Sequence, residues 1–283
     1  ERIAMPMQRA VIDQDIGMTP TTFENPMGIA GFEFVEFAHR DPKELETLFQ
    51  RMGFTEVARH RTKDISLYRQ GRVNYILNRE PGGHAARFVA EHGPCAPAMA
   101  WRVVDAQVAL QRCLDYGAEE YTGADKTLDV PAVIGIGGSL LYLVETYGEK
   151  GSPYAAEFDW LGEADPQPKG VGFYYLDHLT HNVMRGNMDT WYRFYATVFN
   201  FREIRYFDIA GKQTGLTSRA LTSPDGKIRI PINESADAHS QIEEYLREYK
   251  GEGIQHIACF TENIYETVEA MRAQGVDFLD TPE

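Results

Sequence analysis

The sequence predicts an α+β fold made of four repeats of one βαβββ module, arranged as two pairs. Three observations lead to this prediction. Four segments carry apolar residues at the i, i+3, i+4, i+7 spacing of an amphipathic helix, each is followed within four residues by Gly or Asn, and each is preceded by a short strand-like run. A generic α+β protein with a coincidental rhythm is the weaker interpretation, because four helices and four leading strands match.

The helices are predicted from their apolar positions: Leu45, Leu48, Phe49 and Met52; Ala106, Ala109, Leu110 and Cys113; Trp191, Phe194, Tyr195 and Val198; Ile264, Thr267, Val268 and Met271. The residues that follow them are Gly53, Gly117, Asn200 and Gly275. Gly and Asn tolerate the left-handed conformation that ends a helix. The leading strands are expected in the runs GFEFVEFA, AMAWRVV, YLDHLTHNV and IQHIACFT.

The first three helices are each followed by three β-leaning segments with turn residues between them. These are FTEVARHRT, KDISLYRQ and RVNYILNRE, then AEEYTG, PAVIGIG and SLLYLVET, and then FREIRYFD, TGLTSRALT and KIRIPINE. After Gly275 only VDFLDTPE remains. By the repeat, we expect the fourth module to lack its last two strands in this sequence.

We therefore predict a leader at residues 1–27, a first domain of two modules at 28–152 and a second domain at 153–283 whose last module is incomplete. The stretch 148–170, rich in Gly, Pro and Ala, is expected to join the domains. The leader has acidic residues and no continuous apolar core, so it does not resemble a secretory signal. We expect it to be loosely held.

Composition restricts the possible partners. A net charge of −14 argues against nucleic-acid binding, which needs a basic face, and an anionic substrate would need local donors or a metal cation. No apolar run approaches the roughly 18 residues of a membrane span, so we expect no membrane partner. Cys95, Cys113 and Cys259 are odd in number and lack CxxC spacing. That argues against a disulfide framework and a Cys-type zinc site, and it fits a reducing cytoplasm.

The two halves differ in their leading strands. His178 and His256 stand in the second half, whereas apolar or small residues occupy the matching places in the first, within AGFEFV and PAMAWR. Strand alternation places His178 and His181 on opposite faces, so at most one of them can enter a given site. The wide separation of His178 and His256 in sequence suits two strands of one sheet. With a third, carboxylate group they would form the 2-His-1-carboxylate set of non-haem Fe(II).

Several motifs resemble the 4-hydroxyphenylpyruvate dioxygenases, a family with the vicinal-oxygen-chelate fold. They are DHLTHNV, GLTSRAL, DGKIRIPINE, SQIEEY and GEGIQHIA in the second half, and GFEFVEF and NREPGGHAARFVAEHGP in the first. The likeness extends in order over residues 28–283. It implies two open-barrel domains of paired modules, the first non-catalytic and the second catalytic.

The resemblance also implies an oxidoreductase of tyrosine and phenylalanine catabolism. Such an enzyme uses Fe(II) to convert 4-hydroxyphenylpyruvate and O₂ to homogentisate and CO₂. His178 and His256 would be iron ligands, and His181 a packing or hydrogen-bonding residue. The family's third ligand is a Glu in an aromatic-rich strand of the fourth module, so we expect it beyond Glu283. Glu33 and Glu36 of GFEFVEF belong to the first half and are not assigned as ligands.

Four polar residues, Ser218, Asn233, Gln241 and Gln255, resemble groups that line the family's substrate cavity. Each has a structural alternative. Ser218 could satisfy a neighbouring backbone group, Asn233 could shape a turn, and Gln241 could begin a surface helix. Strand alternation should turn Gln255, beside His256, away from the metal.

Two other functions stay open. One is 4-hydroxymandelate synthase, which resembles the dioxygenase in ligands and substrate but oxidises the benzylic carbon. Asn233 favours the dioxygenase, because the synthases carry an apolar residue at that position. The other is a non-catalytic binding protein of the same fold, since only two of three ligands are present. We expect a homo-oligomer, whose size the sequence does not define.

Overall fold

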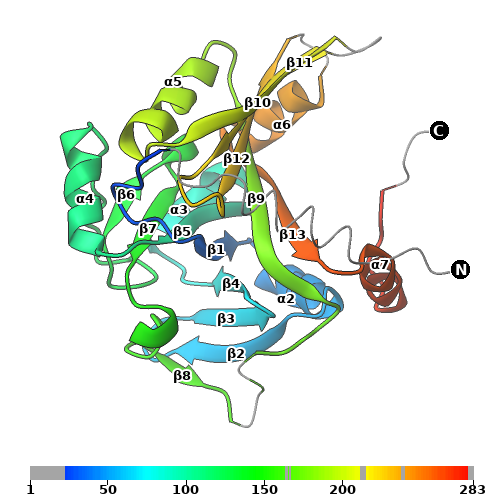
Figure 1. Cartoon of the computed structure of the whole chain (residues 1–283). Coiled ribbons are helices and arrows are strands. Elements are labelled where there is room, and N and C mark those ends of the chain that lie inside the picture. Colours follow the sequence, from blue (N-terminus) through cyan, green and yellow to red (C-terminus); the bar gives the residue numbers. More distant parts are fainter. Residues whose placement is uncertain (1–22, 163–164, 166, 211–214, 237–239, 280–283) are drawn as a thin grey trace, which may run out of the picture.

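The structure, a computed structural model, describes residues 23–162, 165, 167–210, 215–236 and 240–279 (Figure 1). The first half contains, in order, β1 (Phe32–Ala38), α2 (Pro42–Arg51), β2 (Thr55–His60), β3 (Ile65–Gln70), β4 (Val73–Asn78), α3 (Gly83–His92), β5 (Cys95–Arg102), α4 (Ala106–Asp115), β6 (Ala132–Ile134), the 3₁₀ turn η1 (Ile136–Gly138) and β7 (Leu140–Val144). The first module, β1 to β4, has the predicted βαβββ order. The second has two strands after α4, because the strand predicted in AEEYTG is reduced to a bridge between Glu120 and Val133.

The second half repeats this plan. After the 3₁₀ turn η2 (Gly148–Lys150) come β8 (Phe158–Trp160), β9 (Phe173–Val183), α5 (Met188–Arg193), the π-helical turn η3 (Phe194–Val198), β10 (Arg202–Ala210), β11 (Gly215–Thr222), β12 (Arg229–Ser235), α6 (Gln241–Tyr249), β13 (Gly253–Thr261) and α7 (Ile264–Ala273). The third module, β9 to β12, is complete. In the described part of the fourth, β13 is followed by α7 alone.

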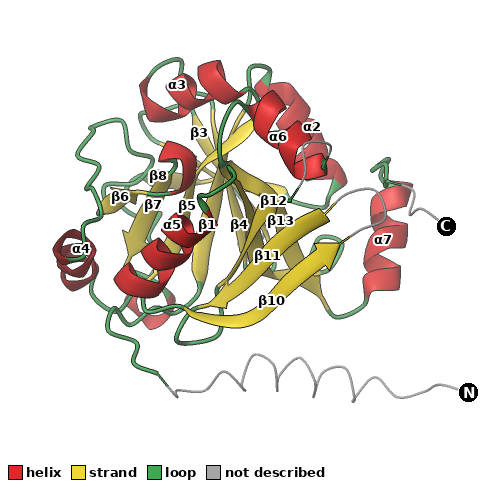
Figure 2. Cartoon of the chain, turned by 90° about the horizontal axis from the view of Figure 1, so that it is seen from above, coloured by secondary structure: helices red, strands yellow, loops and turns green. Residues whose placement is uncertain are grey.

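The strands form two mixed sheets, ordered β6-β7-β5-β1-β4-β3-β2-β8 and β10-β11-β12-β9-β13. In each sheet the leading strands of the two modules pair antiparallel, β1 with β5 and β9 with β13. The leading strand of each complete module also pairs parallel with the last strand of its own module, as β1 does with β4 and β9 with β12. Helices lie around the strands, with α4 and α7 at opposite ends (Figure 2). The predicted pairing of modules is confirmed as two open sheets.

One apolar core joins the two halves. Trp101 of β5 is fully buried, and its ring centroid lies 4.9 Å from that of Phe199 and 5.2 Å from that of Phe201 in the second half. On the other side, the Tyr75 hydroxyl of β4 lies 3.4 Å from the Cys259 Sγ of β13. The first half therefore supports the strand that carries His256 directly.

The predicted segment limits differ from the observed ones. β8 lies inside the predicted linker 148–170, yet it pairs with β2 and extends the first sheet to Trp160, beyond the proposed boundary at 152. Residues 1–22 of the predicted leader lie outside the described residues, whereas Met27 is only 2% exposed and belongs to the core. Among the described residues, no helix is both long and apolar enough to cross a bilayer.

Glu36 of β1 is a carboxyl group enclosed in the first half. Its side chain is buried, with Oε1 2.8 Å from Asn78 Nδ2 and Oε2 2.7 Å from Thr127 Oγ1. Burial raises the pKa of Glu36 above the ordinary 4.5, although the two hydrogen bonds oppose this shift. Such a group contributes stability that is complete below pH 4.5 and is lost as pH rises through the native pKa.

We expect Glu36→Gln to become increasingly stabilising, relative to the native protein, as pH rises through this window. The amide is neutral at every pH, and it can accept from Asn78 and donate to Thr127. The difference in unfolding free energy should grow by at most about 1.4 kcal/mol per pH unit. Urea unfolding at a series of pH values measures it, with the exposed Glu248→Gln as control. An equal pH dependence in native protein and variant would contradict the burial argument.

Candidate metal centre

His178 and His256 come together on neighbouring strands of the second sheet. β13 lies beside β9 (Figure 1), and the antiparallel register places Ala258 opposite His178 and His256 opposite Thr180. The Nε2 atoms of His178 and His256 are 3.3 Å apart, and the two rings meet nearly edge to face. This is the arrangement on two strands of one sheet that the sequence predicts for these histidines.

A β-bulge lies directly before each of the two histidines. In the β9–β13 ladder, Gln255 is skipped between Ile254 and His256, and Asp177 is skipped on the opposite strand. A bulged residue is unpaired and interrupts the alternation of side chains. The bulge brings the side chain of Gln255 against its neighbour, with Oε1 2.7 Å from His256 Nδ1, whereas His256 Nε2 faces His178. The expectation that Gln255 turns away from the metal stays a prediction.

The contacts at Nδ1 define the tautomer of both rings. Asp177 Oδ2 lies 2.7 Å from His178 Nδ1, and Gln255 Oε1 occupies the same place at His256. Both oxygens can only accept, so each Nδ1 carries the hydrogen, and each Nε2 of a neutral ring presents its lone pair. The two lone pairs face one another across 3.3 Å. The Thr180 hydroxyl, 2.9 Å from His256 Nε2, is the nearest donor there.

These residues fit a divalent metal ion. Imidazole nitrogen binds such an ion at about 2.0–2.1 Å, so two nitrogens on one ion are at most about 4.2 Å apart. The observed 3.3 Å satisfies this limit, and a cation would offset the repulsion between the lone pairs. No group of three His, Cys, Asp or Glu side chains within the described ranges could hold a metal ion. The described part of the chain thus offers two imidazoles, and the third ligand stays a prediction.

The surroundings of the pair favour the neutral, metal-binding form of His256. Burial, and next the proximity of His178, lower the pKa of His256, which favours its neutral ring. Nη1 of Arg229, in β12, donates to Asp177 Oδ1 at 2.8 Å. Although burial opposes the shift, the hydrogen bond from His178 and the charge of Arg229 lower the pKa of Asp177. The carboxylate therefore stays ionised beside the ring.

His181 lies on the opposite face of β9, as predicted. It is fully buried, and its Nε2 is 2.6 Å from the Tyr195 hydroxyl. Burial lowers the pKa of His181 to about 3, so the ring is neutral and structural. Its assignment as a packing and hydrogen-bonding residue is confirmed.

Two of the predicted substrate-contacting residues share the sheet face of His178. Asn233 of β12 is opposite Asn182 of β9, with Asn233 Nδ2 3.4 Å from Asn182 Oδ1, and Ser218 of β11 is opposite Asn233. Asn182 follows His178 by four residues, so the two side chains point to the same face. Asn233 lies inside a strand, which excludes the turn alternative.

Gln241 is not part of the sheet that carries Ser218 and Asn233. It is the first residue of α6, its side chain is exposed, and Ser240 caps the helix. This is the surface-helix start that the sequence left as its alternative. Among the described contacts, none links Gln241 to either histidine.

Sequence reasoning missed Asp177, Thr180 and Arg229. An acid directly before a strand histidine was visible in the sequence, but regular alternation would point it to the other face. Only the bulge brings Asp177 to the His178 ring, and no residue pattern of this strand predicts a bulge.

Known proteins resemble this chain over both of its halves. The family model described as the N-terminal part of hydroxyphenylpyruvate dioxygenase matches residues 23–159. That of the glyoxalase/bleomycin resistance protein/dioxygenase superfamily matches residues 175–283. A 4-hydroxyphenylpyruvate dioxygenase of Pseudomonas aeruginosa is 53% identical over 265 residues, covering 92% of this chain and 74% of that protein. The chain belongs to the 4-hydroxyphenylpyruvate dioxygenase family.

Other relatives show how far the likeness extends within and beyond this dioxygenase family. Hemolysin VllY of Vibrio vulnificus is 54% identical over 92% of this chain and 74% of its own length. The solved fusion protein of a xylose isomerase-like TIM barrel and a 4-hydroxyphenylpyruvate dioxygenase has a TM-score of 0.77 and 32% identity, covering 98% of this chain and 45% of that one. A mutant 4-hydroxymandelate synthase of Streptomyces coelicolor has the same TM-score at 22% identity, over 90% of this chain and 78% of that one, and shows the shared vicinal-oxygen-chelate fold alone.

The first half of this dioxygenase-family chain has the same bulge without the histidines. In the β1–β5 ladder Glu33 is skipped, which makes Phe34 the counterpart of His178 and Ala98 the counterpart of His256. Phe34 is fully buried and packs 5.6 Å from Tyr142, measured between ring centroids. Apolar residues therefore fill the matching place, as the sequence predicts.

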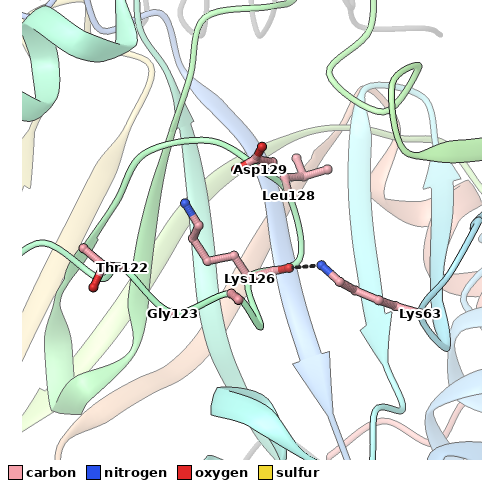
Figure 3. A pocket seen from close by; sticks show the side chains of 7 residues that line it. Lys63, Thr122, Gly123, Lys126, Leu128 and Asp129 are labelled. Carbon is pink, nitrogen blue, oxygen red and sulfur yellow. Dashed lines mark hydrogen bonds between the residues drawn. The ribbon is translucent and has the colours of Figure 1, made fainter.

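A separate cavity of about 180 Å³ opens in the first half (Figure 3). The ammonium group of Lys63 reaches into it but donates to the backbone carbonyl of Lys126, and the Lys126 ammonium donates to that of Val130 at 2.8 Å. Both ammonium groups thereby hold in place the loop that contains Lys126 and Val130. The cavity is lined only by first-half residues, and we assign no catalytic role to it.

Proposed function

We propose that this chain carries the Fe(II) centre of a 4-hydroxyphenylpyruvate dioxygenase, converting 4-hydroxyphenylpyruvate and O₂ to homogentisate and CO₂. One observation carries the proposal: His178 and His256 present their Nε2 lone pairs to one point, 3.3 Å apart, in a chain about half identical to named dioxygenases. All atoms of the keto acid and of O₂ are recovered in the two products, so no further co-substrate is needed.

In this proposal His178 and His256 hold the metal ion, and a Glu beyond Glu283 supplies the third ligand. When bound, Fe(II) provides the positive charge that attracts an anionic keto acid and the redox chemistry that activates O₂. The choice of iron is supported by the donor set, since two imidazoles and one carboxylate are typical of non-haem Fe(II) oxygenases. It also accounts for anion binding by a chain of net charge −14.

Polar side chains on the same sheet face orient the substrate. Ser218 and Asn233 offer a hydroxyl and an amide in one row across β11 and β12, two residues along the sheet from Thr180. Gln255 has an amide NH₂ left over after its oxygen has engaged His256. The fourth proposed contact, Gln241, rests on the resemblance of SQIEEY to the family motif.

Two alternatives are less well supported. A 4-hydroxymandelate synthase shares the fold, but the solved synthase is 22% identical, whereas several dioxygenases are about 50% identical. The polar Asn233 also favours the dioxygenase. A non-catalytic binding protein would be consistent with two metal ligands and no third among the described residues. It would not require both rings to be held in the same metal-binding tautomer.

We also propose a cytoplasmic location for the protein. Cys95, Cys113 and Cys259 are all free thiols, which supports the proposed cytoplasmic location. The homo-oligomer expected from the sequence stays a prediction, which light scattering of the purified protein tests.

Turnover decides between these functions. We expect the protein expressed from its natural reading frame, supplied with Fe(II), ascorbate and 4-hydroxyphenylpyruvate, to consume O₂ and release homogentisate, identified by chromatography. Hydroxymandelate as the main product would establish the synthase instead. Substrate binding without O₂ consumption would establish the binding protein.

A further inference from the structure

We propose that Asp177 is a positioning residue for His178, held against the ring by a β-bulge and by Arg229, and that it contributes to the metal affinity of the site. This inference rests on the proposed metal-binding role of His178. It goes further by assigning a function to a residue that would not itself touch the metal ion.

The bulge makes the contact possible. In a regular strand the side chains of residues 177 and 178 would point to opposite faces of the sheet. Because Asp177 is skipped in the β9–β13 ladder, its carboxylate instead lies beside the ring, with Oδ2 2.7 Å from His178 Nδ1. The acid therefore accepts the Nδ1 hydrogen and leaves Nε2 free as a ligand atom.

Arg229 fixes the other oxygen of the same carboxylate. Its Nη1 is 2.8 Å from Asp177 Oδ1, and Arg229 is the residue opposite His178 in the parallel β9–β12 ladder. One carboxylate oxygen thus faces the imidazole and the other faces the guanidinium. Rotation of the ring would break the first contact, and rotation of the carboxylate would disturb both. The three side chains define one ring orientation.

The first half contains the same pairing of a bulged acid with an arginine, but without an imidazole. Glu33 is the bulged acid there, next to Phe34, and Arg102 Nε lies 2.6 Å from its Oε2. The hydroxyl of Tyr154 donates to the other oxygen of Glu33 at 2.9 Å. A bulged acid paired with an arginine can therefore have a purely structural role. Asp177 must be tested against that purely structural role, and Glu33 supplies the matched control.

Two measurements separate positioning from bracing. The first is the affinity for Co²⁺, measured by calorimetry on the protein expressed from its natural gene. Loss of an outer-shell partner of a ligand typically costs 10–100-fold in affinity, so we expect a loss of this size for Asp177→Ala and a smaller loss for Asp177→Asn, which keeps an acceptor oxygen. The second is the ¹⁵N NMR signature of the His178 tautomer in the metal-free protein, with His178→Ala for assignment. We expect Asp177→Ala to lose the pure Nδ1–H form.

The controls distinguish the possible failures. Glu33→Ala should lower the thermal midpoint yet leave Co²⁺ affinity and the His178 tautomer unchanged. If His178→Ala keeps native Co²⁺ affinity, the proposed metal site itself is wrong. If His178→Ala abolishes binding while Asp177→Ala changes neither affinity nor tautomer, only the positioning role is overturned. Should Asp177→Ala not fold, Asp177→Asn decides through Co²⁺ affinity alone, and an affinity equal to that of the native protein would count against the proposal.

Discussion

Replacing His178 or His256 with Ala is expected to abolish iron binding and dioxygenase turnover in the protein expressed from its natural gene. Each substitution removes one of the two nitrogens that lie 3.3 Å apart, and a single imidazole then remains beside the expected carboxylate. Losing an outer-shell partner already costs 10–100-fold in metal affinity, so losing a ligand should cost at least that much. Iron content after dialysis and homogentisate formation measure the two losses.

His181→Ala provides the contrast on the same strand. His181 faces the core and bonds the Tyr195 hydroxyl, so its loss should lower stability while leaving iron binding and turnover largely intact. Thermal unfolding reports the first effect and iron content the second. If His181→Ala lost iron as completely as His178→Ala, the assignment of strand faces would be wrong.

The largest effect on stability is expected at Trp101, where the two halves share their core. The ring is fully buried between Phe199 and Phe201, so truncation leaves a cavity that the packed aromatic neighbours fill poorly. Burial of this kind makes Trp→Ala cost about 3–5 kcal/mol. We expect Trp101→Ala to lower the unfolding free energy by that amount in urea titrations.

Trp160 of β8 offers the same substitution at a surface site. Its side chain is 41% exposed and lies over Arg69, with the guanidinium carbon 5.3 Å from the ring centroid. Exposed positions change stability by little, and the cation–π contact adds about 0.5–1 kcal/mol. A loss of more than about 2 kcal/mol for Trp160→Ala, or of less than that for Trp101→Ala, would contradict the shared-core description.

Much of the fold could be predicted because the apolar periods are long and repeated. Four helices share one spacing, and α4 buries all four positions predicted for it, Ala106, Ala109, Leu110 and Cys113. Repeats also identified the difference between the halves, since a strand histidine in one copy and Phe34 or Ala98 in the other can be seen by aligning the modules. Two elements were missed: β8 has only three residues, and α3, a helix of ten residues, falls between two modules.

The candidate site was predicted only as far as strand alternation holds. That rule correctly separated His178 from His181, which lie in a regular part of β9. It did not find the contacts of Gln255 and Asp177 with the two rings, because bulges depend on how two distant strands pair. The helix start at Gln241 was visible in the sequence, since Ser240 before it is a common N-cap residue.

The most direct test of the metal centre is an anomalous difference map from crystals of the protein grown with Fe(II) under anaerobic conditions. The arrangement of the two rings predicts one strong peak at the iron edge, about 2.0–2.2 Å from both His178 Nε2 and His256 Nε2. A peak bound to only one of these atoms, or iron held elsewhere while both rings stay bare, would contradict the account.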